Sequence, residues 1–437
     1  MSLGCRVPGK KALSVIARDK KVVSPSLTRE FDFVFSKAKG NFVFDSDNFK
    51  YLDFSALVAV MNAGHSNPEV VKAVKKQLSF GMHAAFADFY AELPVQFSEY
   101  LLSLLPGYGK AFLSNSGTEA VEAAIKLAKW NSGKKYLIAF KNSFHGRTMG
   151  SLSLTDSKKV QRDGFQPFLP VKHAVFPYVY RFKNMDEDAC MHHSLGSVKK
   201  TVNSVKGNVA GIFLEPIQGE GGYIVPPKEF PKALHEFCES KGILLCSDEV
   251  QSGCFRTGKF LALENFNAKA DIVSLSKAIG GGIPLGATVS SSALMKWPAG
   301  SHANTFGGNL LACSAGLATL KFLKEKKCAE NAKKLGKFML SRLEKIKENN
   351  EIVGDVRGLG LMIGIEIVKS KKSKKPAEKE RDLILCEAFK SGLLMLPCGA
   401  EGISAIRICP PLTLTKKEAV IGLDILENSV EKVMKNA

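Results

Sequence analysis

The sequence predicts an α/β fold that combines a large domain, built on a mainly parallel and doubly wound sheet, with a smaller α+β domain. Short, nearly continuous apolar runs alternate with amphipathic runs through the middle of the chain, which is the pattern of parallel strands buried on both faces by helices. Beyond about residue 316, two long basic amphipathic runs lead instead into a Gly-rich strand region. The length of 437 residues is too great for one small core and fits two or three domains.

In chain order, the large domain begins with a helix over residues 68–79, where apolar residues recur three and four positions apart. A helix over 118–130 carries a wide apolar stripe, so we expect it to be well buried. The other elements expected in this domain are a helix over 230–241 and strands over 136–140, 211–217, 242–250, 271–276 and 286–290. The smaller domain is expected to hold helices over 317–326 and 329–349, strands within 353–368 and a final helix from residue 415. These elements divide the chain into an N-terminal segment of the small domain (1–64), the large domain (65–315) and the C-terminal small domain (316–437).

The charge balance is strongly basic, with 61 Lys and Arg against 42 Asp and Glu and a formal net charge of +19. This charge admits nucleic acid, an anionic membrane surface or an anionic small molecule as a partner. The sequence has no zinc-finger, RNA-recognition or helix-turn-helix signature, and no apolar run approaches the about 20 residues of a membrane span. A lysine-dense segment over 369–381 lacks interleaved aromatic residues and is interpreted as a solvated loop. We therefore expect no nucleic-acid and no membrane partner.

The ten cysteines show no repeated spacing, which is typical of reduced thiols in a cytoplasmic protein. We expect no disulfide bridge. Cys190, His192 and His193 form a local cluster without a second pair of ligands at metal spacing, so a solvated loop is favoured over a zinc site. No metal is expected.

Three local patterns stand where open α/β folds bind ligands, at strand ends and helix starts. The small polar loop 114–118 opens onto a helix, where backbone N–H groups and the Thr118 hydroxyl would form a phosphate cradle, although it is also an ordinary N-cap sequence. Asp248 follows an apolar strand and would suit a buried cation such as a protonated pyridine nitrogen, although Asp-Glu pairs are common. Lys277 ends a strand and runs into three glycines, which suits a buried Schiff-base lysine, with a surface lysine at a turn as the alternative.

The order and spacing of these patterns are much more specific than any one of them. Nearly the whole chain resembles the class III aminotransferases, which are pyridoxal 5'-phosphate enzymes of fold type I. The resemblance lies in NAGH at 62–65, NSGTEA at 115–120, FHGRT at 144–148, EPIQGEGG at 215–222, DEVQSG at 248–253, Lys277, TFGGN at 305–309 and RICPPL at 407–412.

This resemblance implies a role for each motif residue. Lys277 would bind the cofactor covalently and shuttle the substrate proton, and Asp248 would pair with the ring nitrogen. Phe144 would stack on the ring, while Val250 and Gln251 would line its opposite face and contact its hydroxyl. The remaining cofactor contacts implied are Ser116, Gly117, Thr118, His145, Glu215 and, from the neighbouring subunit, Thr305. An active site completed across an interface implies a homodimer or a higher homo-oligomer.

The substrate residues resemble those of 4-aminobutyrate aminotransferases. Arg147 and Arg407 resemble their two carboxylate-binding arginines, and a guanidinium binds a carboxylate in a planar, bidentate way. An ω-amino acid has no α-carboxylate, so Glu220 would then pair with Arg407. Val58 stands where ornithine aminotransferases carry tyrosine, which argues against ornithine. The resemblance thus implies amino transfer from 4-aminobutyrate to 2-oxoglutarate.

Two alternatives stay open. Lysine, acetylornithine and other ω-aminotransferases share most of these residues. Some members of the family racemise or epimerise amino acids with the same lysine and cofactor, returning the proton to the same carbon on its other face. Arg147, Glu220 and Arg407 together favour transamination.

Overall fold

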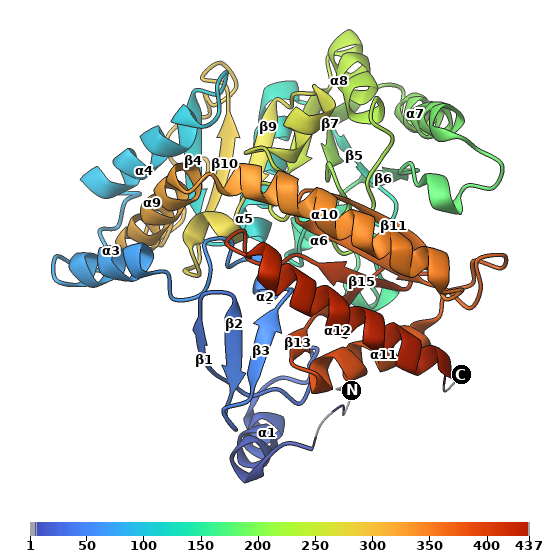
Figure 1. The fold of residues 1–437 in the computed structure, drawn as a ribbon. Coiled ribbons are helices and arrows are strands. Elements are labelled where there is room, and N and C mark those ends of the chain that lie inside the picture. Colours follow the sequence, from blue (N-terminus) through green and yellow to red (C-terminus); the bar gives the residue numbers. More distant parts are fainter. Residues whose placement is uncertain (1–4, 6, 436–437) are drawn as a thin grey trace.

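A seven-stranded sheet forms the centre of the large domain in this computed structural model, which describes residues 5 and 7–435 (Figure 1). Its strand order is β4-β10-β9-β8-β7-β5-β6. Strand β10 pairs antiparallel with β4 and β9, and the other neighbours pair parallel. The strands are β4 (Lys110–Ser114), β5 (Tyr136–Phe140), β6 (Val171–Ala174), β7 (Val209–Leu214), β8 (Leu244–Asp248), β9 (Ile272–Leu275) and β10 (Gly286–Ser290).

Helices pack against this sheet because their apolar stripes need cover. In α5, the predicted stripe is buried, Ser116 caps the N-terminus and Gly133 ends the helix with a φ of 64°. The helical elements of this part are α3 (Pro68–Leu78), α4 (Glu92–Ser103), α5 (Gly117–Ser132), α6 (Met149–Leu154), η1 (Lys159–Gln161), η2 (Val179–Arg181), α7 (Glu187–Ser204), α8 (Phe230–Lys241), η3 (Ala262–Phe266), η4 (Lys277–Gly280) and α9 (Leu310–Glu325).

Two four-stranded sheets lie outside the large one. The first has the order β1-β2-β3-β13, in which a parallel pairing of β13 with β3 joins the two ends of the chain. The second is antiparallel, with the order β11-β12-β15-β14. The strands are β1 (Phe35–Lys39), β2 (Phe42–Asp45), β3 (Lys50–Asp53), β11 (Val353–Leu359), β12 (Met362–Ile367), β13 (Leu393–Leu394), β14 (Leu396–Cys398) and β15 (Ala405–Ile408). The helices are α1 (Lys10–Val22), α2 (Ala56–Ala59), α10 (Cys328–Asn349), α11 (Glu378–Lys390) and α12 (Lys416–Lys435).

The structure confirms the predicted α/β class and every element predicted from the sequence. The bounds of β5, β10 and α8 agree with the prediction, and the other predicted elements differ from it mainly in where they end. The largest difference is at α9, which begins at Leu310, seven positions before the predicted start at 317. The division of the chain after residues 64 and 315 stays a prediction.

Three predictions about local features are wrong. Cys190, His192 and His193 lie in α7 and not in a loop, because Asp186 caps that helix, and Cys190 is buried against the core. The lysine-dense segment forms a loop only up to Ala377, because α11 begins at Glu378. A disulfide joins Cys5 to Cys386, although the other eight cysteines are free and buried.

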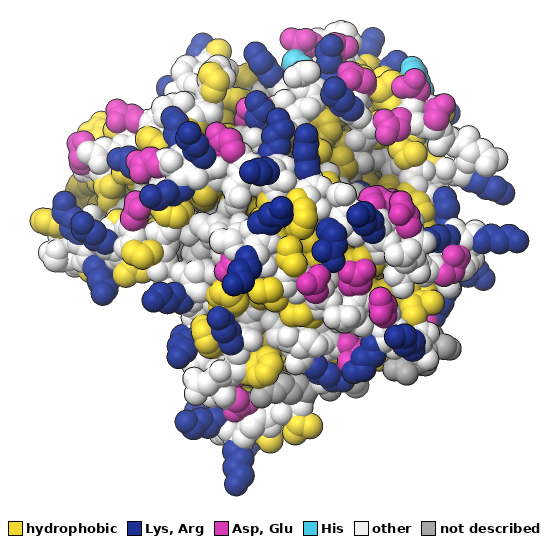
Figure 2. Space-filling view, in the orientation of Figure 1, with side chains coloured by type: hydrophobic (Ala, Val, Ile, Leu, Met, Phe, Trp, Pro, Cys, Tyr) yellow, Lys and Arg dark blue, Asp and Glu magenta, His cyan; other side chains and the backbone are white. Residues whose placement is uncertain are grey.

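Basic side chains are spread over the surface. Figure 2 shows Lys and Arg side chains scattered over the visible face, with acidic side chains between them. No helix within the described residues is long and apolar enough to cross a membrane.

Candidate active site

A cavity of about 320 Å³ opens at the carboxyl ends of β8 and β9. This edge of a parallel sheet is where open α/β folds place their ligands. The lining residues are Gly117, Thr118, Phe144, His145, Gly146, Arg147, Glu215, Asp248, Val250, Gln251 and Lys277. The structure thus brings together all but one of the cofactor residues expected within a single chain, together with Arg147.

The acid in this cavity is Asp248, the last residue of β8, and it is buried. Its Oδ2 lies 2.8 Å from Nδ1 of buried His145, and its Oδ1 accepts a hydrogen bond from the Val250 amide at 3.1 Å. Burial opposes a charge on His145, but the hydrogen bond and the charge of Asp248 outweigh it and raise the pKa of His145. The contact therefore fixes the Asp248 carboxylate in the cavity and favours a proton on His145.

Lys277 stands two residues after β9, at the start of η4. Its φ of 47° is in the left-handed region, a strained conformation that clusters at functional sites. Burial lowers the pKa of its amine, the charge of Asp248 opposes this shift, and the charge of Arg407 adds to it. An amine of lowered pKa is more readily neutral, as a nucleophile or a proton acceptor must be.

The N-terminus of α5 forms an anion cradle beside the lysine. The amides of Gly117 and Thr118 belong to the first helical turn and have no intrahelical acceptor. A Cβ on Gly117 would lie 2.7 Å from Cγ1 of Val250, and a Cβ on Gly146 would lie 2.4 Å from Oγ1 of Thr118. Glycine at these two positions therefore leaves room for the Val250 side chain and the Thr118 hydroxyl beside the cradle.

Ser116 lies at the edge of this cradle and does not line the cavity. Its hydroxyl oxygen accepts a hydrogen bond from the Glu119 amide at 3.3 Å and so caps α5. The alternative of an ordinary N-cap therefore holds for Ser116, while the free amides beside it still fit a phosphate.

Glu215 positions two loops that border the cavity. Its carboxylate accepts hydrogen bonds from the amides of Phe144, at 2.8 Å, and Gly219, at 2.9 Å. Burial raises the pKa of Glu215 to about 7. Gln251 is held similarly, because its Oε1 accepts a hydrogen bond from Tyr223 at 2.7 Å.

Arg407, on β15, forms the expected ion pair with Glu220. Its Nη1 lies 3.2 Å from Oε2 of Glu220. Burial opposes the charge of Arg407, but Glu220 outweighs this and raises the pKa of the guanidinium. In the described structure, Nε of Arg407 has no hydrogen-bond partner. The guanidinium is therefore held at one nitrogen and retains donors for another carboxylate.

Thr305 and Val58 do not line the cavity, and neither do Ser116, Glu220 and Arg407. Thr305 is exposed on the segment between β10 and α9, as a residue that serves a neighbouring subunit would be. Val58 lies on α2, where four consecutive residues, Ala56–Ala59, have positive φ. The last of them, Ala59, packs with Tyr223 and with Cys409, which directly follows β15, the strand of Arg407.

The sequence analysis missed two sets of residues at this site. Lys158 forms a second ion pair with Glu220, and no local pattern marks a contact between residues 62 positions apart. The hydroxyl of Thr118 lies 2.6 Å from that of Ser151 and 2.8 Å from that of Thr148, while Glu122 accepts from the Ser151 amide. Helical spacing of Thr148 and Ser151, three positions apart, is a signal that points to this cluster.

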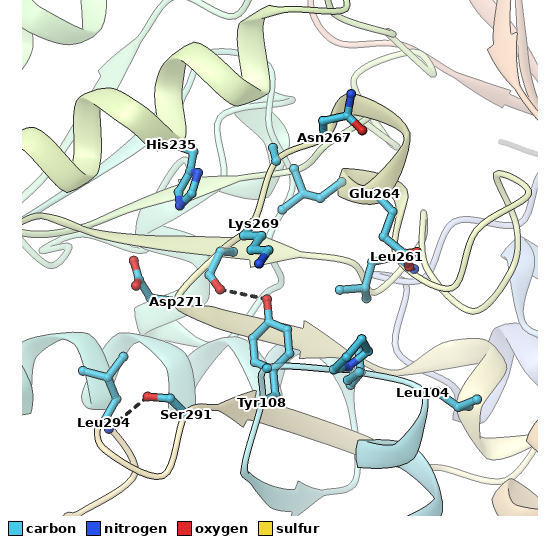
Figure 3. A pocket seen from close by; sticks show the side chains of 16 residues that line it. Leu104, Tyr108, His235, Leu261, Glu264, Asn267, Lys269, Asp271, Ser291 and Leu294 are labelled. Atoms are coloured by element: carbon cyan, nitrogen blue, oxygen red, sulfur yellow. Dashed lines mark hydrogen bonds between the residues drawn. The ribbon is translucent and has the colours of Figure 1, made fainter.

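A second cavity, of about 600 Å³, lies at the opposite, amino-terminal edge of the large sheet (Figure 3). Its polar groups bond to the backbone around it: Tyr108 donates to the Ala270 carbonyl, and Asp271 accepts from the Leu245 amide, both at 2.8 Å. Within the described residues, no group of three or more His, Cys, Asp or Glu is arranged to hold a metal ion.

The comparisons with known proteins agree with this geometry. Residues 23–430 match the family model of class III aminotransferases. The chain is 35% identical to an alanine/serine racemase of Pyrococcus horikoshii, over 98% of this chain and 92% of that protein. It is 39% identical to an acetylornithine aminotransferase of Methanosarcina mazei, over 95% and 96% of the two chains. It is 34% identical to a 4-aminobutyrate aminotransferase of Mycobacterium bovis, over 96% of each chain.

Solved structures of aminotransferases share this fold. An aminotransferase of Bacillus anthracis superimposes with a TM-score of 0.90 and is 28% identical, over 98% of this chain and all of that one. The relatives therefore agree on the fold and the family, while their names differ in substrate and in reaction.

Proposed function

The chain belongs to the class III aminotransferases, whose cofactor is pyridoxal phosphate, and we propose that it transfers an amino group from an ω-amino acid to 2-oxoglutarate. The donor that we propose is 4-aminobutyrate, with succinate semialdehyde and glutamate as products. The observation that supports this proposal is the pairing of Glu220 with Arg407, whose charges both act on Lys277, while Arg147 lines the cavity with that lysine. Such a pair neutralises the second arginine when a donor with one carboxylate is bound.

The lining residues fit pyridoxal phosphate, because the amides at the start of α5, a buried acid and a half-buried lysine meet in one cavity. In our proposal, Gly117 and Thr118 hold the phosphate, Asp248 faces the ring nitrogen, and Lys277 binds covalently. Phe144 and Val250 would cover the two faces of the ring, and Gln251 would contact its hydroxyl. When bound, the cofactor supplies an electron sink for the charge that develops on the substrate carbon.

The proton chemistry is assigned to Lys277. Once a substrate amine has displaced it from the cofactor, its Nζ would take the proton from the substrate carbon that bears the amine and return a proton to the cofactor side. Burial lowers the pKa of this amine, which favours its neutral form, while the charge of Asp248 opposes that shift. Glu215 holds the loops of Phe144 and Gly219 in place around the reacting atoms.

Carboxylate recognition separates the two substrates. Arg147 would bind the carboxylate distal to the reacting amine in both 4-aminobutyrate and glutamate. Glutamate and 2-oxoglutarate have a second carboxylate, which would take Arg407 from Glu220. One side-chain pair thus lets a single site accept both substrates in turn.

A panel of amino donors with 2-oxoglutarate, followed by glutamate formation, tests this proposal. We expect 4-aminobutyrate to have the highest kcat/KM in the panel. Arg147→Ala should raise KM for donors with a distal carboxylate by about 10-fold or more, while sparing simple amines. A higher kcat/KM for ornithine, acetylornithine or lysine would replace the donor, and no glutamate from any donor would reject the reaction.

A racemase is the second candidate, and it is supported by the likeness to the alanine/serine racemase over 98% of this chain. Racemisation uses no amino acceptor, so incubation with L-amino acids and no 2-oxo acid separates the two reactions. D-isomers formed without any keto product would overturn the transaminase proposal.

We also propose a homodimer. Thr305 and Phe306 are exposed, and the Phe306 ring packs on His83, with the ring centroids 5.3 Å apart. The segment that contains His83 also exposes Phe80, Phe89 and Tyr90, so exposed aromatic side chains belong to the segment that packs against the Thr305 loop. Light scattering on the active enzyme tests this, and a fully active monomer would contradict it.

A further inference from the structure

Glu220 lies between two cationic side chains, and each of its carboxylate oxygens forms an ion pair with one of them. Nζ of Lys158 is 2.7 Å from Oε1, and Nη1 of Arg407 is 3.2 Å from Oε2. The Glu220 side chain is 18% exposed, against 39% for Lys158 and 10% for Arg407. Burial opposes the charge of Glu220, but the two cations outweigh it and lower the pKa of the carboxyl.

The backbone places Lys158 opposite Glu220. Lys158 lies just before η1, where Ser157 donates from its hydroxyl to Oε1 of Gln161 at 2.7 Å. The Ser157 carbonyl accepts from the Glu401 amide at 3.3 Å, and the Glu220 carbonyl accepts from the Gly399 amide at 2.9 Å. The backbone next to Lys158 and the backbone of Glu220 are therefore both hydrogen-bonded to the same short segment, residues 399–401. This segment holds the two residues of the ion pair near each other.

Exchange of substrates creates an electrostatic problem at this point. A substrate with an α-carboxylate needs Arg407, and Glu220 must release it. A mostly buried carboxylate that loses its only cation pays the full cost of desolvation. Lys158 removes this problem, because Glu220 keeps a cation at hydrogen-bond distance after Arg407 turns away.

We propose that Lys158 is a specificity-determining residue, which holds the Glu220 carboxylate whenever Arg407 binds the α-carboxylate of a dicarboxylic substrate. This inference rests on the proposed function. Lys158 touches neither substrate nor cofactor and acts through Glu220. Without it, Glu220 would hold Arg407 more tightly, so dicarboxylates would bind more weakly while monocarboxylates would not be affected.

The test uses the holoenzyme and two unreactive probes. Glutarate has two carboxylates for Arg147 and Arg407, and valerate has one. Lys158→Met should weaken glutarate binding, measured by calorimetry, by about 3- to 10-fold, since the partly exposed lysine is screened by solvent. Valerate binding should stay the same. In turnover, KM for 2-oxoglutarate should rise by a similar factor, with KM for the ω-amino donor and kcat little changed.

Two further variants make this test specific. Lys159→Met is the matched control, because Lys159 is the neighbouring lysine and pairs with exposed Glu401, at 3.6 Å, instead of Glu220. It should bind both probes as the unaltered enzyme does. Lys158→Arg should restore glutarate binding, because it restores the cation. Thermal unfolding of each variant checks that the fold is retained.

The outcomes separate this inference from the function on which it rests. Glutarate binding that depends on Arg407, shown by weakening in Arg407→Lys, but that is equal in Lys158→Met and Lys159→Met, overturns the role of Lys158 alone. Equal weakening of glutarate and valerate by Lys158→Met also overturns it, since that pattern indicates a structural role. No glutarate binding, or binding that ignores Arg407→Lys, overturns the proposed function together with the inference.

Discussion

The two edges of the large sheet carry nearly the same chemical groups in very different surroundings. The cavity at the carboxyl edge contains a lysine, an aspartate, a glutamate and a histidine, and the cavity at the amino edge contains one of each as well. At the carboxyl edge these are Lys277, Asp248, Glu215 and His145. At the amino edge they are Lys269, Asp271, Glu264 and His235, all of which Figure 3 labels among the residues that line the cavity.

Burial and mutual contact distinguish the two sets. Asp248, Glu215 and His145 are buried, and Asp248 pairs directly with His145. At the amino edge, Lys269 and Glu264 are exposed. Perturbed groups that face one another in a dry cavity are those that can do chemistry. The comparison teaches that composition and volume do not identify this site, because the larger cavity has the same residue types but, among the described residues, no direct contact like that of Asp248 with His145.

Replacement of the two lysines should give the largest contrast. Lys277→Ala should reduce kcat/KM by about 10³-fold or more, because it removes both the covalent attachment and the proton carrier. Lys269→Ala, at the amino edge, should leave kcat/KM unchanged. Steady-state kinetics with 2-oxoglutarate measures both. A comparable loss in the two variants would remove the distinction between the edges.

The two aspartates provide a second matched pair, because each accepts a hydrogen bond from a backbone amide. Asp248→Asn should lower kcat by about 10²-fold, since the amide removes the fixed charge that His145 faces in the cavity. Asp271→Asn keeps its volume and should change kcat by less than about twofold. If Asp248→Asn were equally harmless, the role of the acid would be wrong.

Sequence patterns predicted those parts of the molecule whose cause is local. β5, β10 and α8 are recognisable because an apolar run or stripe and its flanking residues lie within one window. The edge strand β1 was not predicted, because its exposed residues show no apolar alternation. The helix that contains Cys190 was missed although Asp186, with Glu187 and Asp188 in the first turn, is a recognisable N-cap.

The candidate site divides in the same way. The phosphate cradle, Asp248 and Lys277 could be predicted because each stands at the end of a strand or the start of a helix. The contact of Lys158 with Glu220 and the disulfide of Cys5 with Cys386 could not, because they join positions 62 and 381 residues apart. Only the folded chain brings such groups together, and no window of sequence contains both.

The two glutamates should differ in how stability depends on pH, which is the smallest effect of the three. Burial raises the pKa of Glu215 in the folded chain from 4.5 to about 7. The folded state therefore holds more protons than the unfolded state between these pH values, so this residue makes stability fall as pH rises through that window. Glu215→Gln has no such proton. The difference in free energy of unfolding between Glu215→Gln and the unaltered protein should therefore shift by up to about 3 kcal/mol in favour of the variant as the pH rises from 4.5 to 7.

Glu264→Gln is the matched control at the amino edge, where the exposed carboxylate only accepts a hydrogen bond from the Leu261 amide, at 2.7 Å. Because its side chain is exposed, its free energy of unfolding should stay within about 0.5 kcal/mol of that of the unaltered protein. Urea unfolding at several pH values measures the free energy of unfolding of the unaltered protein and of both variants. The comparison uses the change of this free energy with pH, because Glu215→Gln also loses a backbone hydrogen bond at every pH. Parallel profiles for Glu215→Gln and the unaltered protein would mean that Glu215 is charged in the folded state, and the carboxyl edge would then be no drier than the amino edge.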